Sequence, residues 1–296
     1  MEREWETGAY HALSEDLKSI SSYLSNKKNS NKSYSGVDQL TWDDLAMDEI
    51  FNKLKYTQST VGSEYLFNQL RDIEPKIEGI NDKEELYTLL ATDQTLREQV
   101  LLILSGLGKL NYTNSSSFFH EHSHKKIDHS YLYVLLALLP VASVALMFFS
   151  LQYGLISLII AFTINMLVYY RNKNLLENKL FSITYAAAII NTGKRLTSIN
   201  HHPEFEAYVK AIRKTVKPIK KISYWGKMVS TGGGGEFDFL SEYIRMLFML
   251  DFIAYNKIVQ TITDHQNEYR HVWERIGELD AAIAVADYRK SLDTNC

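Results

Sequence analysis

The densest group of metal-binding side chains in the sequence lies between residues 120 and 129. It consists of His120, Glu121, His122, His124 and His129. Histidines spaced as His-x-His can bind zinc or nickel when a fold fixes their geometry. The group directly precedes a long apolar block, so we interpret it as a solvated loop beside a membrane. We therefore expect no metal site and no cofactor in this chain.

A second candidate is the basic stretch at residues 210–227, KAIRKTVKPIKKISYWGK. It contains no acid, and its cations are Lys210, Arg213, Lys214, Lys217, Lys220, Lys221 and Lys227. Three interpretations remain open. The stretch could bind DNA phosphates while Tyr224 and Trp225 stack on bases. It could instead lie on anionic lipid, or form a solvated helix face.

Neither a nucleotide site nor a catalytic group is indicated. A P-loop requires GxxxxGK[ST], whereas the run Gly232–Gly235 is followed by Glu236, Phe237 and Asp238. A carboxylate beside a phosphate would repel it, so we interpret the run as a flexible linker. No Ser-His-Asp, Cys-His or paired-carboxylate arrangement stands out. The single cysteine, Cys296, excludes an intrachain disulfide, and we predict no catalytic residues and no enzyme activity.

Between the histidine group and the basic stretch lies a long block of residues without charge. Residues 131–170 read YLYVLLALLPVASVALMFFSLQYGLISLIIAFTINMLVYY. The block is too long for one helix and fits two that each cross a hydrocarbon core of about 30 Å. Polar residues and a glycine near 150–154 place the break there, giving spans of Tyr131–Ser150 and Gly154–Tyr170. Pro140 predicts a kink in the first span. The alternative is a buried helical hairpin in a large soluble core.

Charges beside the block predict its orientation. Lys125 and Lys126 precede it, Arg171 and Lys173 follow it, and the turn carries none. Because positive residues stay on the cytoplasmic side, both termini should be cytoplasmic. The sequence thus predicts an integral membrane protein with two spans and the lipid bilayer as a partner.

The rest of the sequence predicts an all-α protein. Apolar residues make up 46% of the chain and only 4 prolines interrupt it, while a net charge of −3 does not itself favour a nucleic-acid partner. We expect a linker at Ser25–Gly36. Before the apolar block we expect helices over Glu4–Leu24, from Thr41, where Asp44 completes the cap, from Ser59, and over Asp82–Leu104. After the block we expect helices over Leu175–Ile199, from Pro203, and over Phe237–Leu292, the last with a break near Thr263–His265. The expected segments are 1–36, 37–126, 127–174 and 175–296, the last interrupted by a Gly-rich break at 231–235.

Two outer segments carry a recognisable pattern. Residues 47–75, MDEIFNKLKYTQSTVGSEYLFNQLRDIEP, place a threonine- and glycine-containing turn between two helices at Thr57, Thr60, Gly62, Leu66, Leu70 and Pro75. Residues 272–292, VWERIGELDAAIAVADYRKSL, carry Leu279, Asp280 and Ala286. These patterns resemble the start of the core and lever domain, and the return helix of the lever, in the MutS family of DNA mismatch-repair ATPases.

The resemblance covers about half of the chain and implies a helical core and lever bundle interrupted by the hairpin. In that family the lever couples an ATPase to a DNA-engaging end, and its return helix leads to the ATPase domain through a linker of which Cys296 could be part. Here a membrane hairpin sits inside the domain, and the clamp and the mismatch-reading domain are not recognisable. We expect the ATPase domain to be missing or separate, and full-length relatives to bind ATP.

The resemblance therefore implies a mechanical role without catalysis. The chain would couple a MutS-like ATPase domain, or a second copy of itself, to the membrane, with DNA or anionic lipid contacting residues 210–227. The alternative is a membrane scaffold or interaction protein without a nucleic-acid role.

Overall fold

The computed structural model describes residues 20–30, 36–54, 56–72, 80–110, 115–116, 118, 126–199, 203–229 and 238–293. Within these ranges the chain is α-helical and forms no strand, which confirms the predicted all-α fold. One isolated antiparallel bridge joins Gly36 and Asp72. The chain divides into two compact units, and each is built from segments that are not contiguous in sequence.

Unit 1 comprises Met1–His120, Ile189–Lys217 and Asn267–Cys296. Its first helices are α3 (Ser22–Ser30), α4 (Gln39–Asp44), α5 (Met47–Leu54) and α6 (Thr60–Arg71). Their apolar faces bury Trp42, Phe51 and Phe67 in one cluster together with Ala281 of α14 (Gln266–Asp293). The guanidinium of Arg71 lies 4.0 Å from the Trp42 ring centroid and closes this cluster.

The remaining helices of unit 1 pack around α14. They are α7 (Ile80–Thr92), α8 (Gln94–Ser105), the end of α10 (Leu151–Leu196) and the beginning of α11 (Pro203–Val229). The side chains of Trp273, Ile276 and Leu279 on α14 are fully buried. Gly193 of α10 allows close packing here, since an added Cβ would lie 2.8 Å from Val272 Cγ1.

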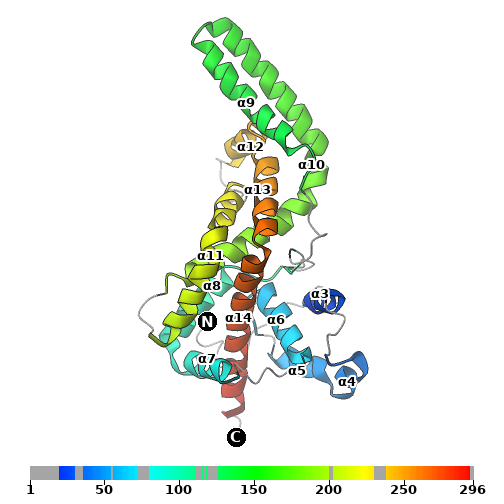
Figure 1. The fold of residues 1–296 in the computed structure, drawn as a ribbon, viewed down its shortest axis with the longest axis vertical. Coiled ribbons are helices and arrows are strands. Elements are labelled where there is room, and N and C mark those ends of the chain that lie inside the picture. Colours follow the sequence, from blue (N-terminus) through cyan, green and yellow to red (C-terminus); the bar gives the residue numbers. More distant parts are fainter. Residues whose placement is uncertain are drawn as a thin grey trace. The chain divides into compact units, whose positions relative to one another are not determined.

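Unit 2 comprises Glu121–Ala188 and Pro218–Gln266. Helix α9 (Ser130–Met147) and the first part of α10 run antiparallel as a hairpin (Figure 1), joined by a turn at Phe148–Ser150. Helices α12 (Asp238–Leu247) and α13 (Leu250–Asp264) belong to the same unit. Gly154 permits the tight turn, because a Cβ there would lie 2.4 Å from Met147 Cγ.

Several predicted boundaries are wrong in detail. The turn of the hairpin lies at 148–150 instead of 150–154, and residues 25–30 belong to α3 instead of a linker. Asp38 caps α4 by accepting a hydrogen bond from Thr41 N at 2.7 Å, so Thr41 is not the cap. The predicted helix Asp82–Leu104 divides at Asp93, whose side chain caps α8. The predicted break near Thr263–His265 is confirmed at His265, and a second break lies at Met249.

Candidate functional site

The hairpin presents an apolar surface that the described protein does not cover. Only 11% of residues 130–147 and 17% of residues 151–173 are buried, and both helices are long and apolar enough to cross a membrane. Phe148 and Phe149 in the turn are 89% and 90% exposed. A soluble core would bury such residues, so the structure does not support the soluble-core alternative. Exposed apolar patches of this extent mark interaction surfaces.

Asn165 is the polar centre of the hairpin. It is fully buried, and its amide nitrogen donates to the carbonyls of Leu136 at 3.0 Å and Leu247 at 2.6 Å. In an α-helix the carbonyl of residue 136 would accept from the N–H of residue 140. That residue is Pro140, which has no N–H. Asn165 therefore satisfies an acceptor that the proline leaves unpaired, and a second one at the C-terminal end of α12.

A second set of polar contacts joins the hairpin to α13. The Tyr169 hydroxyl donates to Asp251 Oδ2 at 2.7 Å, and Arg245 Nη1 lies 3.9 Å from Asp251 Oδ1. Burial raises the pKa of Asp251, while the bond from Tyr169 opposes that shift. The rings of Tyr133 and Phe252 stack at a centroid distance of 4.4 Å. The hairpin is thus fixed to the rest of unit 2 by hydrogen bonds as well as by packing.

The predicted basic stretch lies on α11. All seven of its cations are exposed, whereas Val209, Ile212, Val216, Ile219 and Ile222 are buried. The cations recur with helical spacing, so α11 has one basic face and one apolar face. Arg213 donates to the carbonyl of Thr197 at 3.1 Å. Tyr224, on the basic face, is 62% exposed, and Trp225 is half-buried.

The two segments that resemble the MutS family meet at Asp280. Its carboxylate accepts from Gln58 N at 2.7 Å, from Ser59 N at 2.9 Å and from Ser59 Oγ at 2.6 Å. A Cβ on Gly62 would lie 2.2 Å from Asp280 Oδ2, so glycine is needed there for close approach. Burial raises the pKa of Asp280 to about 6, and these hydrogen bonds oppose that rise. Gly62 and Asp280 each belong to one of the two sequence patterns, but their spacing does not predict that they touch.

A second buried carboxylate lies on α6. Glu64 Oε1 accepts from Ser115 N at 2.9 Å, whereas Glu64 Oε2 has no hydrogen-bond partner among the described residues. Burial raises the pKa of Glu64 to about 8. Ser115 also accepts a hydrogen bond from Trp273 Nε1 at 2.8 Å. Burial therefore favours the neutral, protonated form of this carboxyl.

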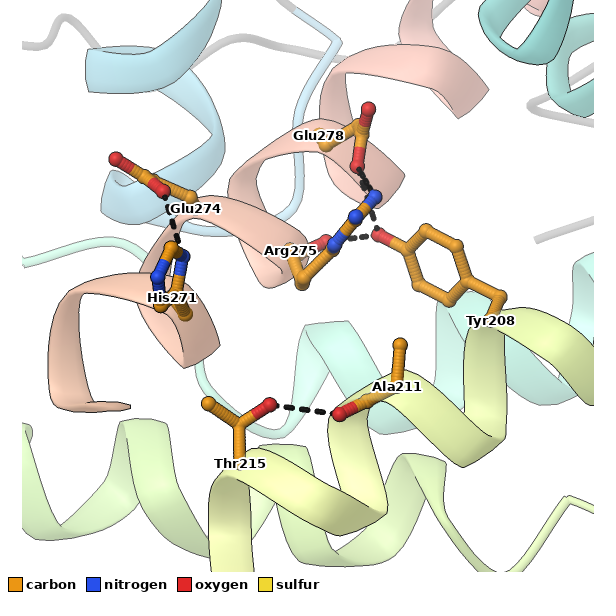
Figure 2. Close-up of polar contacts among 7 residues, drawn as sticks. All are labelled: Tyr208, Ala211, Thr215, His271, Glu274, Arg275 and Glu278. Atoms are coloured by element: carbon orange, nitrogen blue, oxygen red, sulfur yellow. Dashed lines mark hydrogen bonds and ion pairs between the residues drawn. The ribbon is translucent and has the colours of Figure 1, made fainter. Parts of the chain in front are cut away.

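Figure 2 shows a surface cluster where α11 faces α14 in unit 1. Tyr208 donates to the carbonyl of Arg275, and the Arg275 guanidinium bonds Glu278 at 2.8 Å. The same guanidinium lies 5.4 Å from the Tyr208 ring centroid. A groove of about 970 Å³, lined also by Asp82 and Glu84, borders these residues. The charges of Arg275 and Glu278 pair with each other, so the cluster is consistent with helix packing.

The histidine group is only partly described. His129 precedes α9 in a left-handed conformation with φ of +57°, and its ring contacts Tyr131 at a centroid distance of 6.0 Å. His120, Glu121, His122 and His124 lie outside the described residues, as do Gly232–Gly235. Among the residues that are described, no three His, Cys, Asp or Glu side chains come together to hold a metal.

Neither Asn165 nor Glu64 was predicted from the sequence as a site residue. A polar residue inside an apolar block is a recognised signal of a buried interaction, so Asn165 could have been found. Glu64 carries no such signal, because an acid in an amphipathic helix is usually solvated. In comparisons with family models, curated proteins and solved structures, no match to this chain reached significance.

Proposed function

We propose that this chain is a membrane-anchored MutS-like core and lever module. Its hairpin spans the bilayer twice, and its helical units act on the cytoplasmic side. The module would relay movement between an ATPase domain and the membrane, with the basic face of α11 contacting DNA or anionic lipid. It has no catalytic role of its own.

The observation that carries the membrane assignment is the exposure of the hairpin. Leu138, Ile159 and Leu167 within its two helices are 54% to 66% exposed, which is unfavourable in water and favourable in lipid. The polar atoms inside the hairpin support the same assignment. Backbone groups must be paired within the hydrocarbon region, and Asn165 pairs the carbonyl that Pro140 leaves without a donor.

Charges support the cytoplasmic orientation. Lys126 and Arg171 are exposed close to the open end of the hairpin, and the turn at Phe148–Ser150 has no charge. An uncharged turn crosses a bilayer more easily than a charged end.

The meeting of the two resembling segments supports the MutS-like part of the proposal. More than two hundred residues separate Ser59 from Asp280, and three hydrogen bonds join the two loci. In a core and lever arrangement the outgoing and returning segments should pack together, as α6 and α14 do here.

Site-directed labelling of single cysteines tests the topology. The native cysteine is replaced by Cys296→Ser, and one cysteine is introduced at Phe149, at Leu40 or at Leu292, all of which are exposed. A membrane-impermeant maleimide added to intact cells should label Phe149→Cys alone, and the other two should react only after the cells are opened. Labelling of all three in intact cells, or recovery of the chain in the soluble fraction, would refute the membrane assignment.

The coupling role needs a second experiment. The chain in lipid nanodiscs is mixed with the P-loop ATPase domain encoded in the same gene or beside it. The expected result is a stable complex whose ATPase rate depends on the chain, and whose formation fails when Asp280→Ala disrupts the α6–α14 junction. If no such ATPase is encoded there or none binds, the coupling role is wrong, and the membrane scaffold alternative takes its place.

A further inference from the structure

We propose that α12 is a third lipid-contacting element, an amphipathic helix that lies in the cytoplasmic interface of the bilayer with Leu240, Tyr243 and Ile244 in lipid. The inference rests on the proposed membrane insertion of the hairpin and extends the lipid contact beyond its two helices.

Exposure defines the lipid-facing side of α12. Leu240, Tyr243 and Ile244 are 59%, 52% and 44% exposed. Their spacing of three and four residues places them on one side of the helix. Met246, on another side, is 2% exposed and packs inside the unit. Glu242 is exposed on the side opposite Leu240. A short helix with one apolar and one charged side is typical of an interfacial element.

Contacts with the hairpin make this apolar side continuous with the hairpin surface. The Tyr243 ring lies 6.5 Å from the Phe162 ring, centroid to centroid. One turn later, the carbonyl of Leu247 accepts the hydrogen bond from Asn165 at 2.6 Å. Arg245 holds the other side of α12 by donating to the carbonyl of Val229 at 2.8 Å.

The depth of the contact between Asn165 and Leu247 fits an interfacial position. Arg171 is the first charged residue after the second span, and Asn165 precedes it by six residues. At 1.5 Å per residue that separation is about 9 Å along the helix axis. Interfacial helices seat their apolar face about 5–10 Å into the boundary between headgroups and acyl chains. The end of α12 that meets Asn165 therefore lies at a depth that an interfacial helix reaches in lipid.

Lipid is the occupant that the continuity favours. Any bilayer that surrounds Phe162 also reaches Tyr243, because the two rings are in contact. A second copy of the chain could cover the same side of α12, and the experiment below separates the two.

The test uses fluorescent probes at single cysteines in the full chain carrying Cys296→Ser. An environment-sensitive probe is attached at Leu240→Cys, at Ile244→Cys and, as a matched control on the same helix, at Glu242→Cys. A probe at Ile160→Cys, a 53% exposed position in the hairpin, reports insertion itself. The chain is reconstituted into phosphatidylcholine and phosphatidylglycerol vesicles with and without doxyl-labelled lipid.

We expect the doxyl lipid to quench the probes at positions 160, 240 and 244, with at least about threefold less quenching at 242, because only the apolar side of an interfacial helix enters the lipid. Quenching at 160 without quenching at 240 and 244 would overturn the α12 proposal and leave the hairpin assignment intact. A blue-shifted but unquenched probe at 240 would also overturn it, because protein would then cover α12. Lack of quenching at 160 would overturn both proposals.

Discussion

Replacing Gly62 with alanine tests the junction between α6 and α14 most directly. The new Cβ would lie 2.2 Å from Asp280 Oδ2 and 2.5 Å from Asp280 Cγ, closer than any real contact. The Asp280 side chain must move, and movement breaks at least one of its three hydrogen bonds to Gln58 and Ser59. We expect Gly62→Ala to lower the free energy of opening of this region substantially.

The magnitude follows from two contributions. Overpacking of a dense core costs about 1–3 kcal/mol, and each hydrogen bond to a charged group contributes about 1.5–3 kcal/mol. Loss of one such bond together with the overpacking gives about 4 kcal/mol. In hydrogen exchange measured by mass spectrometry, that loss corresponds to roughly a thousandfold faster exchange in peptides from α6 and from the middle of α14.

Gly106→Ala is the matched control in the same unit. Gly106 ends α8 in a right-handed conformation, and its added Cβ would lie 2.9 Å from Arg195 Nη1 but at ordinary contact distance, 3.4 Å, from the carbonyl of Ile103. The flexible Arg195 side chain can move aside, so the change should alter the free energy of opening by less than about 1 kcal/mol. Asp280→Ala removes the closest atoms, so adding Gly62→Ala to it should cost less than Gly62→Ala alone. Equal exchange in Gly62→Ala and Gly106→Ala would refute the reasoning.

Three further predictions concern the other sites. The pKa of Glu64 rises from 4.5 to about 8 on folding, so folding binds a proton at neutral pH. The free energy of unfolding should therefore fall as the pH rises from 6 to 8, by about 1.4 kcal/mol per pH unit. Urea unfolding of Glu64→Gln should lack this pH dependence. Asn165→Leu should destabilise unit 2 by about 1–2 kcal/mol in thermal unfolding in detergent. The loss should be smaller in a chain that also carries Pro140→Ala, because the alanine N–H can then pair with the carbonyl of Leu136. Equal losses with Pro140 and with Pro140→Ala would refute the pairing. Replacing Lys210, Lys214 and Lys217 with glutamate should weaken binding to anionic vesicles by about 100-fold or more, given about 1 kcal/mol per lysine near the surface. The same replacement at exposed Lys53, Lys194 and Lys257 should leave vesicle binding unchanged. Loss of DNA binding without loss of vesicle binding would favour the nucleic-acid interpretation.

The helical fold and the hairpin were predictable because they depend on simple sequence patterns. An uncharged block of this length determines two apolar helices, and Ser59 and Pro203 begin helices where the sequence predicts them. The break at Asp93 was also within reach, since aspartate is a preferred N-cap residue.

Other boundaries carry no such pattern. Ala46 and Met249 interrupt helices in left-handed conformations, with φ of +49° and +50°. Neither is a glycine or an asparagine, the residues that usually adopt this conformation. Tertiary packing determines the break at Met249, because Met249 and the nearby Phe252 are fully buried, whereas Ala46 is exposed. A local rule cannot predict a conformation that distant contacts impose.

The candidate sites divide in the same way. All seven cations of the basic stretch are exposed on one helix, as the spacing indicates, because an exposed helix face follows from periodicity alone. The contact between Gly62 and Asp280 could not be predicted, since residues so far apart in sequence meet only through the packing of unit 1.

Pro140 and Asn165 show how two unremarkable residues acquire a joint role. Each is individually unfavourable in an apolar helix, the proline because it removes a hydrogen bond and the asparagine because its amide needs partners in lipid. Together they compensate each other in part: the carbonyl of Leu136 that Pro140 leaves unpaired accepts from Asn165 Nδ2, whereas Asn165 Oδ1 has no partner among the described residues. The second hydrogen of the same amide then reaches Leu247 and fixes α12 against the hairpin. A hairpin that served only to cross lipid would need neither residue, so this pair indicates a hairpin built to hold the helices beside it.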